Sequence, residues 1–442
     1  MTRPVTVIGG GLAGSEAAWQ LARAGVPVRL VEMRPVRPTL AHHTDKLAEL
    51  VCSNSLGSRT EGTAAALLKA EMRLMDSLVM RAAEQAAVPA GGALAVDRDV
   101  FSEAIMADLL AHPHVELVRE EQVSLDPEAP TLIATGPLTS EALSAELSRH
   151  VGHAHLHFYD AAAPILVKDS LDMAVVFPQA RYDKGDGVYL NCPMDRDQYL
   201  AFHEALVGAE GAVLHLGETE RNFFESCLPV EVLGRRGVDT LRFGPMKPVG
   251  LTDPRTGRRP YAVVQLRQDN VVGDLYNMVG FQTQLKWGEQ TRVFRMIPGM
   301  ERAEFVRMGV MHRNTYLASP AFLAPTLQWR DRPQWFVAGC LVGVEGYSES
   351  AASGALAGLN LARVLRGQDP IVLPRTSMLG ALMHYVTHAD PARFQPMNSN
   401  WGLLEPPAGP RIRDKVERHR LMGERGLGDL RAALAGALAT LA

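Results

Sequence analysis

The four cysteines are the residues of this chain with the clearest nucleophilic chemistry. Cys52 opens a Cys-Ser-Asn-Ser run, and Cys227 lies before Pro229, near the end of a predicted helix. Cys192 and Cys340 flank apolar stretches, where burial as an inert thiol is the common outcome. The thiolate is the reactive form of cysteine. Cys52 and Cys227 are therefore the candidates for a reactive thiol, with burial as the alternative for each.

A glycine-rich turn near the N-terminus predicts a dinucleotide-binding unit. The apolar run 5–8 predicts a buried strand, residues 15–24 predict a helix, and residues 28–31 predict a second strand. The turn has the spacing Gly-x-Gly-x-x-Gly, and an acid suited to bind ribose follows about 20 positions later. Glycines let a pyrophosphate approach the backbone, and the helix N-terminus offers it N–H groups. The residues predicted to hold the dinucleotide are Gly9, Gly10, Gly11, Leu12, Ala13, Gly14 and Glu32.

Two later strands favour FAD over NAD as this dinucleotide. The runs 131–134 and 335–338 are apolar, each is followed closely by a glycine, and residues 351–365 predict a helix. Such segments resemble the accessory motifs of glutathione-reductase-type flavoproteins, where the late strand and helix N-terminus lie against the flavin. The sequence has no second Gly-x-Gly-x-x-Gly, so we expect a nicotinamide reductant to bind only transiently. The additional residues predicted to contact FAD are Thr135, Gly136, Gly339, Gly346, Ser350 and Ala351.

The motifs together predict an α/β fold: a glutathione-reductase-type, FAD-binding Rossmann-like domain with an inserted α+β domain. The regular alternation of strands and helices is lost in the middle of the chain. The late apolar strand over 335–338 follows only after this long stretch. We expect residues 1–185 to form the first part of the FAD-binding domain and residues 186–325 to form an inserted substrate domain. Residues 326–442 would complete the FAD-binding domain and add a C-terminal tail.

Periodicity predicts several elements outside the glycine-rich unit. Residues 63–87 predict one helix with core methionines. In the insert, strands are expected over 188–190 and 263–266, and helices over 195–207 and 218–228.

Composition excludes several classes of protein. The chain has 442 residues, a net charge of −4 and only four cysteines, which excludes a disulfide scaffold and a broadly basic nucleic-acid binder. Neither a targeting segment nor a bilayer-length apolar run is visible, so we expect a cytoplasmic protein without a membrane partner. A whole-chain sum can still hide a local positive face. Basic clusters occur at Arg235-Arg236 and from Arg255 to Arg259, within the expected insert.

Histidines at 153, 155 and 157 alternate and would share one face of a strand. A metal site there is conceivable, but no Cys or acidic partner has ligand spacing. We therefore expect a polar strand face and no metal.

Several longer motifs carry a resemblance to one family. The chain resembles the folate- and FAD-dependent tRNA uracil-5-methyltransferases of bacteria over nearly its whole length. The motifs that carry this resemblance are 9–14, 52–56, 93–98, 189–194, 243–251, 311–316, 343–354, 387–390 and 394–398. The nearest confusable family modifies the wobble uridine of tRNA; it shares the FAD fold but is longer and has a helical C-terminal domain.

The resemblance implies a reaction in which methylenetetrahydrofolate gives a one-carbon unit to C5 of the T-loop uridine of tRNA. Reduced FAD would supply the hydride, and NAD(P)H would recharge it. A thiolate adding at C6 would turn uracil into an enolate able to attack the methylene carbon. By motif, Cys227 is interpreted as this nucleophile and Cys52 as the flavin-side thiol that assists proton removal from C5. The residues assigned to folate are His312 and Tyr347, with Arg313 and Asn314 as further folate or tRNA contacts.

The resemblance also implies that tRNA, through its T-arm, meets the basic clusters near Arg235 and Arg258. Two other functions stay open from the residues alone. One is an FAD-dependent oxidoreductase of a small metabolite, and the other is a flavin-containing factor that binds or folds tRNA. Both share the predicted FAD site, so only the reaction distinguishes them from the methyltransferase.

Overall fold

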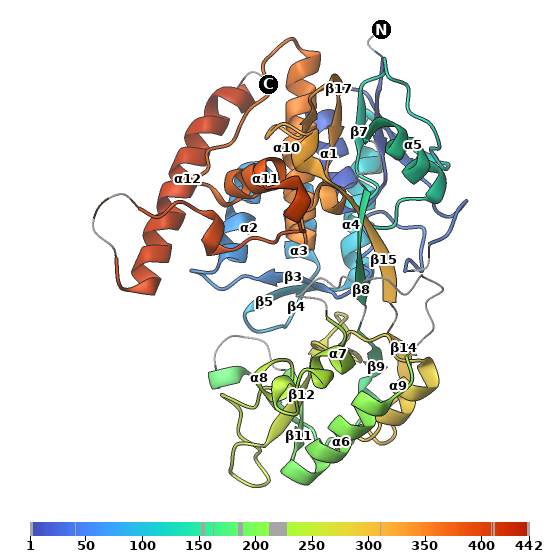
Figure 1. The fold of residues 1–442 in the computed structure, drawn as a ribbon, viewed down its shortest axis with the longest axis vertical. Helices are drawn as coiled ribbons and strands as arrows, with labels where there is room; N and C mark the ends of the chain where they lie inside the picture. Colours follow the sequence, from blue (N-terminus) through green and yellow to red (C-terminus); the bar gives the residue numbers. More distant parts are fainter. Residues whose placement is uncertain are drawn as a thin grey trace.

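A computed structural model shows the protein as two bodies stacked along its long axis (Figure 1). The structure describes residues 3–39, 41–151, 155–161, 163–183, 189–211, 228–309, 311–407, 409 and 412–439. The first described strand, β1, and the end of the last described helix, α12, belong to the larger body. The larger body is built on a parallel sheet and the smaller one on an antiparallel sheet.

The larger body contains a six-stranded sheet in the order β16-β17-β7-β1-β2-β6. Five of the strands are parallel, and β16 pairs antiparallel with β17 at one edge. The late strand β17 therefore returns the chain to the first sheet, and the predicted α/β fold with an insertion is confirmed. The strands are β1 (Val5–Ile8), β2 (Val28–Glu32), β6 (Val115–Arg119), β7 (Thr131–Ile133), β16 (Gln328–Trp329) and β17 (Arg332–Val337).

Two helices, α1 (Leu12–Arg23) and α10 (Tyr347–Leu365), pack so closely that their backbones nearly touch. A Cβ atom added at Gly354 would lie 2.2 Å from the carbonyl oxygen of Ala13, and one at Gly358 would lie 2.6 Å from that of Ala17. Small residues let the helices approach, as they do wherever backbones nearly touch. Because Ala13 faces Gly354 and Ala17 faces Gly358, the two helices run in the same direction.

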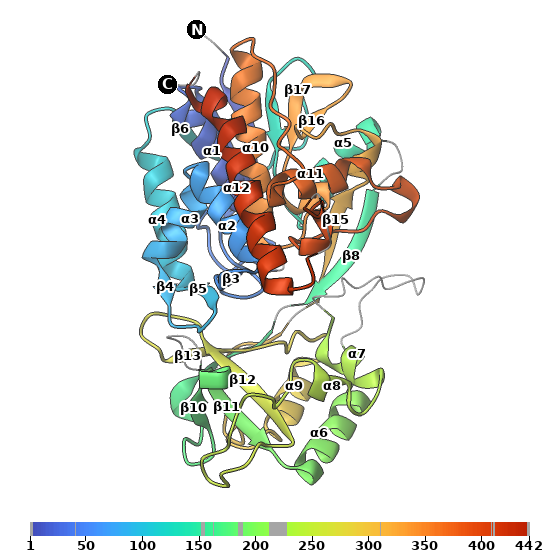
Figure 2. The same cartoon turned by 90° about the vertical axis from the view of Figure 1, so that its left-hand side faces the viewer.

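Other helices and a small sheet complete the larger body, and Figure 2 shows the C-terminal helix running along it, where it contacts α2. The helices are α2 (Ala64–Leu74), α3 (Leu78–Gln85), α4 (Arg98–Ala111), α5 (Glu141–Val151), α11 (Met378–His388) and α12 (Lys415–Ala439). The small sheet consists of β3 (Ser55–Ser58), β4 (Ala87–Val88) and β5 (Ala93–Val96). Short 3₁₀ helices are η1 (Lys168–Ser170), η2 (Arg181–Asp183), η4 (Ser319–Ala321), η5 (Gly339–Val342), η6 (Pro391–Arg393) and η7 (Trp401–Leu403).

The single helix predicted over 63–87 is wrong, because the chain forms α2 and α3 with a break between them. Asp76 adopts φ +53°, a left-handed conformation that no helix interior accepts. Ser77 then starts α3, where its side chain accepts a hydrogen bond from the Met80 N–H. Met72, Met75 and Met80 are all buried, as the core interpretation expected.

The smaller body is an α+β unit with its own apolar core. Its six strands are antiparallel, in the order β10-β11-β12-β13-β9-β14. The strands are β9 (Ile165–Val167), β10 (Phe177–Gln179), β11 (Tyr189–Met194), β12 (Ala262–Gln268), β13 (Leu275–Met278) and β14 (Phe305–Arg307). The helices are α6 (Arg196–Gly208), α7 (Val230–Arg235), α8 (Thr240–Phe243) and α9 (Trp287–Phe294).

The strands expected near 188–190 and 263–266 correspond to β11 and β12, and the helix expected over 195–207 corresponds to α6. The helix predicted over 218–228 lies, except for its last residue, outside the described residues. Since β9 and β10 pair into the antiparallel sheet, we propose that the insert begins near residue 164 and ends near 309, in place of 186 and 325.

An antiparallel pair, β8 (His155–Ala161) and β15 (Met311–Leu317), links the insert with the larger body (Figure 1). In the part of the chain that the structure describes, no helix is long and apolar enough to cross a membrane.

Candidate functional site

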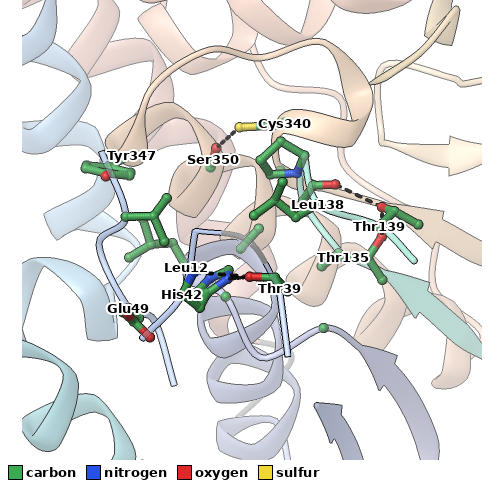
Figure 3. Close-up of a pocket in the computed structure, with 18 of the residues that line it drawn as sticks. Leu12, Thr39, His42, Glu49, Thr135, Leu138, Thr139, Cys340, Tyr347 and Ser350 are labelled. Carbon is green, nitrogen blue, oxygen red and sulfur yellow. Dashed lines mark hydrogen bonds between the residues drawn. The ribbon is translucent and has the colours of Figure 1, made fainter. Parts of the chain in front are cut away.

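A cleft of about 460 Å³ opens at the carboxyl edge of the parallel sheet. Residues that follow all five parallel strands line it, which is where open α/β sheets bind their ligands. Figure 3 shows Leu12, Thr135, Thr139, Tyr347 and Ser350 around this space. Its volume is that of a pocket for a small molecule or cofactor.

The turn after β1 has a backbone that only glycine fits at two positions. Gly9 has φ +100°, and a Cβ there would lie 2.6 Å from the Ala134 carbonyl oxygen. A Cβ at Gly14 would lie 1.8 Å from the carbonyl oxygen of Gly9, so α1 can start close to the sheet only with glycine here. A Cβ at Gly11, by contrast, would meet no protein atom within 4 Å, and Gly11 lines the cleft.

Two helix N-termini border the same cleft. Gly11 is the N-cap of α1 and Gly346, with φ +112°, is the N-cap of α10; among the described residues, neither end has a side-chain cap. The first-turn N–H groups and the positive dipole end of α1 therefore face the cleft, which suits phosphate or another anion. At α10 a carboxylate of the same first turn is already present, because a Cβ at Gly346 would lie 2.3 Å from Glu349 Oε2. Ser350, near the start of α10, lies 3.2 Å from the Cys340 sulfur.

Glu32 ends β2 and contacts the glycine-rich turn directly. One carboxylate oxygen accepts the Gly10 N–H at 2.8 Å, and the other accepts both the N–H and the Nε–H of Arg34 at 3.0 and 2.9 Å. Burial alone would raise the pKa of Glu32, but the hydrogen bonds and charge of Arg34 outweigh it and lower the pKa. Glu32 is thus held as a carboxylate at the edge of the cleft, with lone pairs left for a ribose.

The structure brings most of the predicted dinucleotide residues to this one cleft. Those that line it are Gly9, Gly11, Leu12, Ala13, Glu32, Thr135, Gly136, Gly339, Gly346 and Ser350. Gly10 supports Glu32 and Gly14 packs on Gly9, whereas Ala351 is fully buried behind the start of α10. These three residues therefore contribute by packing against, or hydrogen bonding to, residues of the cleft and not by lining it.

Cys52 lines the same cleft, on a loop between β2 and β3. The Tyr347 hydroxyl accepts hydrogen bonds from the Cys52 N–H at 2.7 Å and the Ser53 N–H at 3.3 Å. Burial raises the pKa of Tyr347, so its hydroxyl stays protonated. Tyr347, which the resemblance assigned to folate, is therefore in contact with the loop that carries the candidate thiol.

Cys227, the other candidate thiol, lies outside the described residues. His312, Arg313 and Asn314 belong to β15, where the His312 backbone is opposite Asp160 of β8, but their side chains are also outside the description. Among described side chains, no group of three His, Cys, Asp or Glu is placed to bind a metal.

The basic clusters of the insert differ in how far they are neutralised. Arg235, Arg258 and Arg259 are exposed. Arg255, however, is in an ion pair with Asp253 at 2.9 Å, within the same turn. The positive face available from residues 255–259 therefore rests on Arg258 and Arg259.

Two arginines next to Cys52 were given no role by the sequence. Arg98, at the start of α4, donates to the Leu50 carbonyl, and Arg307, on β14 of the insert, donates to the Val51 carbonyl directly before Cys52. Arg98 is the last residue of the 93–98 motif, so the sequence did draw attention to this position. Arg307 carried no such signal, because only the fold brings β14 beside a loop far away in the sequence.

Comparison with known proteins identifies the family. The sequence model of the family described as "Glucose inhibited division protein A" matches residues 4–369. The methylenetetrahydrofolate–tRNA-(uracil-5-)-methyltransferase TrmFO of Enterococcus faecalis is 57% identical over 427 residues, covering 97% of this chain and 98% of that protein. The chain belongs to the TrmFO family. The TrmFO of Lactiplantibacillus plantarum is also 57% identical, over 96% of each chain.

Solved structures agree with the TrmFO assignment at the level of fold. The structure of Aquifex aeolicus GidA superposes with a TM-score of 0.68 at 19% identity, covering 99% of this chain and 76% of the GidA chain. The whole TrmFO chain thus has the GidA fold.

Proposed function

We propose that this protein binds FAD in the cleft and methylates uracil C5 in the T-loop of tRNA, with methylenetetrahydrofolate as the carbon donor. NAD(P)H would recharge the flavin. The relatives that are 57% identical over nearly the whole chain are named as folate-dependent tRNA (uracil-5-)-methyltransferases, which supports the reaction class. The observation that carries the proposal is that a cysteine and the dinucleotide-binding turn line one cleft.

The residues around the cleft fit FAD. The uncapped start of α1, with Gly11 open toward the cleft, suits the pyrophosphate. Glu32 is ionised and suits the adenosine ribose. When bound, FAD supplies the hydride that turns the transferred carbon into a methyl group.

The protein's own part in the reaction begins with a thiolate. Cys227 is assigned to add to uracil C6, which places negative charge on C5 and lets C5 attack the methylene carbon of the folate. This attack breaks one of the two carbon–nitrogen bonds that hold the methylene carbon. Cys52 is assigned to take the C5 proton, which lets the second carbon–nitrogen bond break and releases the folate. Hydride addition to the exocyclic carbon and release of the C6 thiolate then give 5-methyluracil. Nucleophilic and base roles both require a thiolate.

The remaining substrates have assigned places. His312 and Tyr347 would contact the folate, with Arg313 and Asn314 close by. The exposed arginines of the insert, Arg235 and Arg258, would meet phosphates of the T-arm. The target base must leave its stack to reach the cleft, which costs a few kcal/mol, roughly, and favours a loop as the substrate.

Reconstitution with single-component omissions tests this proposal. The FAD-bound protein is incubated with unmodified tRNA, methylenetetrahydrofolate and NADPH, and 5-methyluridine is scored by mass spectrometry. We expect product only when all components are present. Bound FAD without product would refute the methyltransferase assignment, and tRNA binding without product would favour a flavin-containing tRNA-binding factor instead.

A further inference from the structure

The loop that carries Cys52 is held from both bodies of the protein. The Leu50 carbonyl accepts a hydrogen bond from Arg98, which belongs to the larger body. The Val51 carbonyl accepts one from the Arg307 Nη2 at 2.5 Å, and Arg307 belongs to the insert. The two carbonyls directly before Cys52 are therefore fixed by two guanidinium groups, one from each body.

The insert contacts the other side of this loop as well. The Asn54 side chain donates to the Gln268 carbonyl at 2.9 Å and accepts from the Arg267 Nε–H at 3.1 Å. Asn54 is fully buried and also donates to the Val96 carbonyl at 3.0 Å. The position of Cys52 thus depends on the insert being docked.

The charges around Cys52 do not cancel. Arg98 is in a largely buried ion pair with Asp269, with a shortest distance of 3.0 Å. Arg307 has no carboxylate within ion-pair distance in the described structure, and its buried Nε has no hydrogen-bond partner there. Glu49, which also interacts with Arg307, is in an ion pair with Arg34 at 2.9 Å. Arg267, which donates to Asn54 of the same loop, has no ion pair among the described residues either. The described groups around this loop therefore carry more positive than negative charge.

The other titratable groups around this loop do not neutralise that charge. His43 lies near Arg98 and Arg307; burial and then Arg307 lower its pKa, which favours the neutral imidazole, and a neutral imidazole cannot offset a positive charge. Tyr347 is a neutral phenol because burial raises its pKa. The acids that interact with Arg98 and Arg307 are Asp269 and Glu49, and each already has an arginine partner.

We infer that Arg307 is a positioning residue for Cys52: from the insert, it fixes the loop that carries this thiol and places its own positive charge beside that loop. Arg98 holds the same loop but shares its charge with Asp269. The reactivity of the Cys52 thiol then depends on docking of the insert. This inference rests on the catalytic role proposed for Cys52, but its test uses neither tRNA nor folate.

The pH dependence of Cys52 alkylation in the FAD-bound protein tests the inference. Iodoacetamide labels the protein at a series of pH values, and mass spectrometry follows the peptide that carries Cys52. Arg307→Gln should raise the midpoint of alkylation by about one pH unit, the lower end of what an adjacent opposite charge gives. Arg307→Lys should restore most of the difference, because it keeps the charge.

The matched control is Arg295→Gln. Arg295 also lies in the insert and also binds a backbone carbonyl, that of Ala303, through two nitrogens at 3.2 and 2.9 Å. Its substitution should leave the midpoint unchanged. An unchanged midpoint in Arg307→Gln, with FAD still bound, would overturn the inference.

Asp269→Asn provides a test in the opposite direction if Arg307→Gln does not fold. Loss of this carboxylate frees the charge of Arg98, so the midpoint should fall. A rise or no change would contradict the charge argument. The proposed function is judged separately, by methylation. Methylation could fail while the alkylation midpoints move as expected, and the midpoints could stay unchanged while methylation succeeds.

Discussion

Two glycines of the same turn, Gly11 and Gly14, should respond to alanine in opposite ways. Gly11 has φ −75° and ψ −169°, an extended backbone that alanine accepts, and its Cβ would meet no protein atom within 4 Å. Alanine gains about 0.4–1 kcal/mol from the unfolded chain at such a site, and loses roughly 0.5–1 kcal/mol relative to glycine as an N-cap. Gly11→Ala should therefore leave the free energy of unfolding of the apoprotein within about 1 kcal/mol of wild type.

The added methyl group at Gly11 projects into the cleft, where the pyrophosphate of FAD is assigned. It should block close approach to the first-turn N–H groups of α1. Losing two hydrogen bonds to a charged group costs about 3 kcal/mol at least, which is roughly 100-fold in the FAD dissociation constant.

Gly14→Ala has the other outcome, because its Cβ would lie 1.8 Å from the Gly9 carbonyl oxygen. Relief requires α1 to move away from the sheet, and overpacking of this kind costs about 3 kcal/mol. The apoprotein itself should then be destabilised.

Denaturant unfolding without FAD, and FAD titration followed by flavin fluorescence, measure the two effects. Gly208→Ala is the matched control, since Gly208 lies in the insert and its Cβ would also meet nothing within 4 Å. It should change neither quantity appreciably. Wild-type FAD affinity in Gly11→Ala would refute the assignment of the phosphate site, and strong destabilisation of its apoprotein would refute the steric reasoning.

Three further predictions concern buried or reactive side chains. Cys227→Ala should abolish methylation and Cys52→Ala should slow it by roughly 100-fold or more, each with FAD still bound; activity retained by Cys227→Ala would remove it as nucleophile. Burial lowers the pKa of Lys69 to about 8, below the unfolded value of about 10.4, so the folded state binds fewer protons between these values and gains stability as pH rises. The free energy of unfolding of wild type, relative to that of Lys69→Met, should rise by about 3 kcal/mol from below pH 8 to above pH 10, as measured by denaturant unfolding. A difference that does not change with pH would contradict the burial of a charged amine. Tyr347→Phe leaves the two N–H groups of the Cys52 loop without their acceptor, so unfolding should become easier by about 1–3 kcal/mol, and no change would show that the loop does not depend on this hydroxyl.

The glycine-rich unit could be predicted from the sequence because everything that defines it is local. Strand, turn, helix and second strand follow one another without interruption, and the glycine positions report backbone constraints that the structure shows directly. The break at Asp76 could not be predicted, because the apolar period continues through it and only the packing of α2 and α3 decides where the helix ends. Strands β9 and β10 have three residues each, too few to show a period, so the sequence does not indicate that they pair into the antiparallel sheet.

The cleft itself was only partly predictable. Glu32 was expected as an acid at the end of β2, and it is there, but its pairing with Arg34 had no sequence signal. Cys52 and Tyr347 were each singled out, yet the hydrogen bond that joins them crosses most of the chain. The same holds for Arg307, whose contact with Val51 exists only because the insert docks on the larger body. Long-range contacts of this kind depend on the fold and not on spacing.

The origin of the transferred carbon tests the central claim most directly. The FAD-bound protein, unmodified tRNA and NADPH are combined with methylenetetrahydrofolate that carries ¹³C in its methylene group, and the nucleosides are analysed by mass spectrometry. The proposed function predicts 5-methyluridine with the label in its methyl group. Unlabelled 5-methyluridine, or no product from protein with FAD bound, would contradict it.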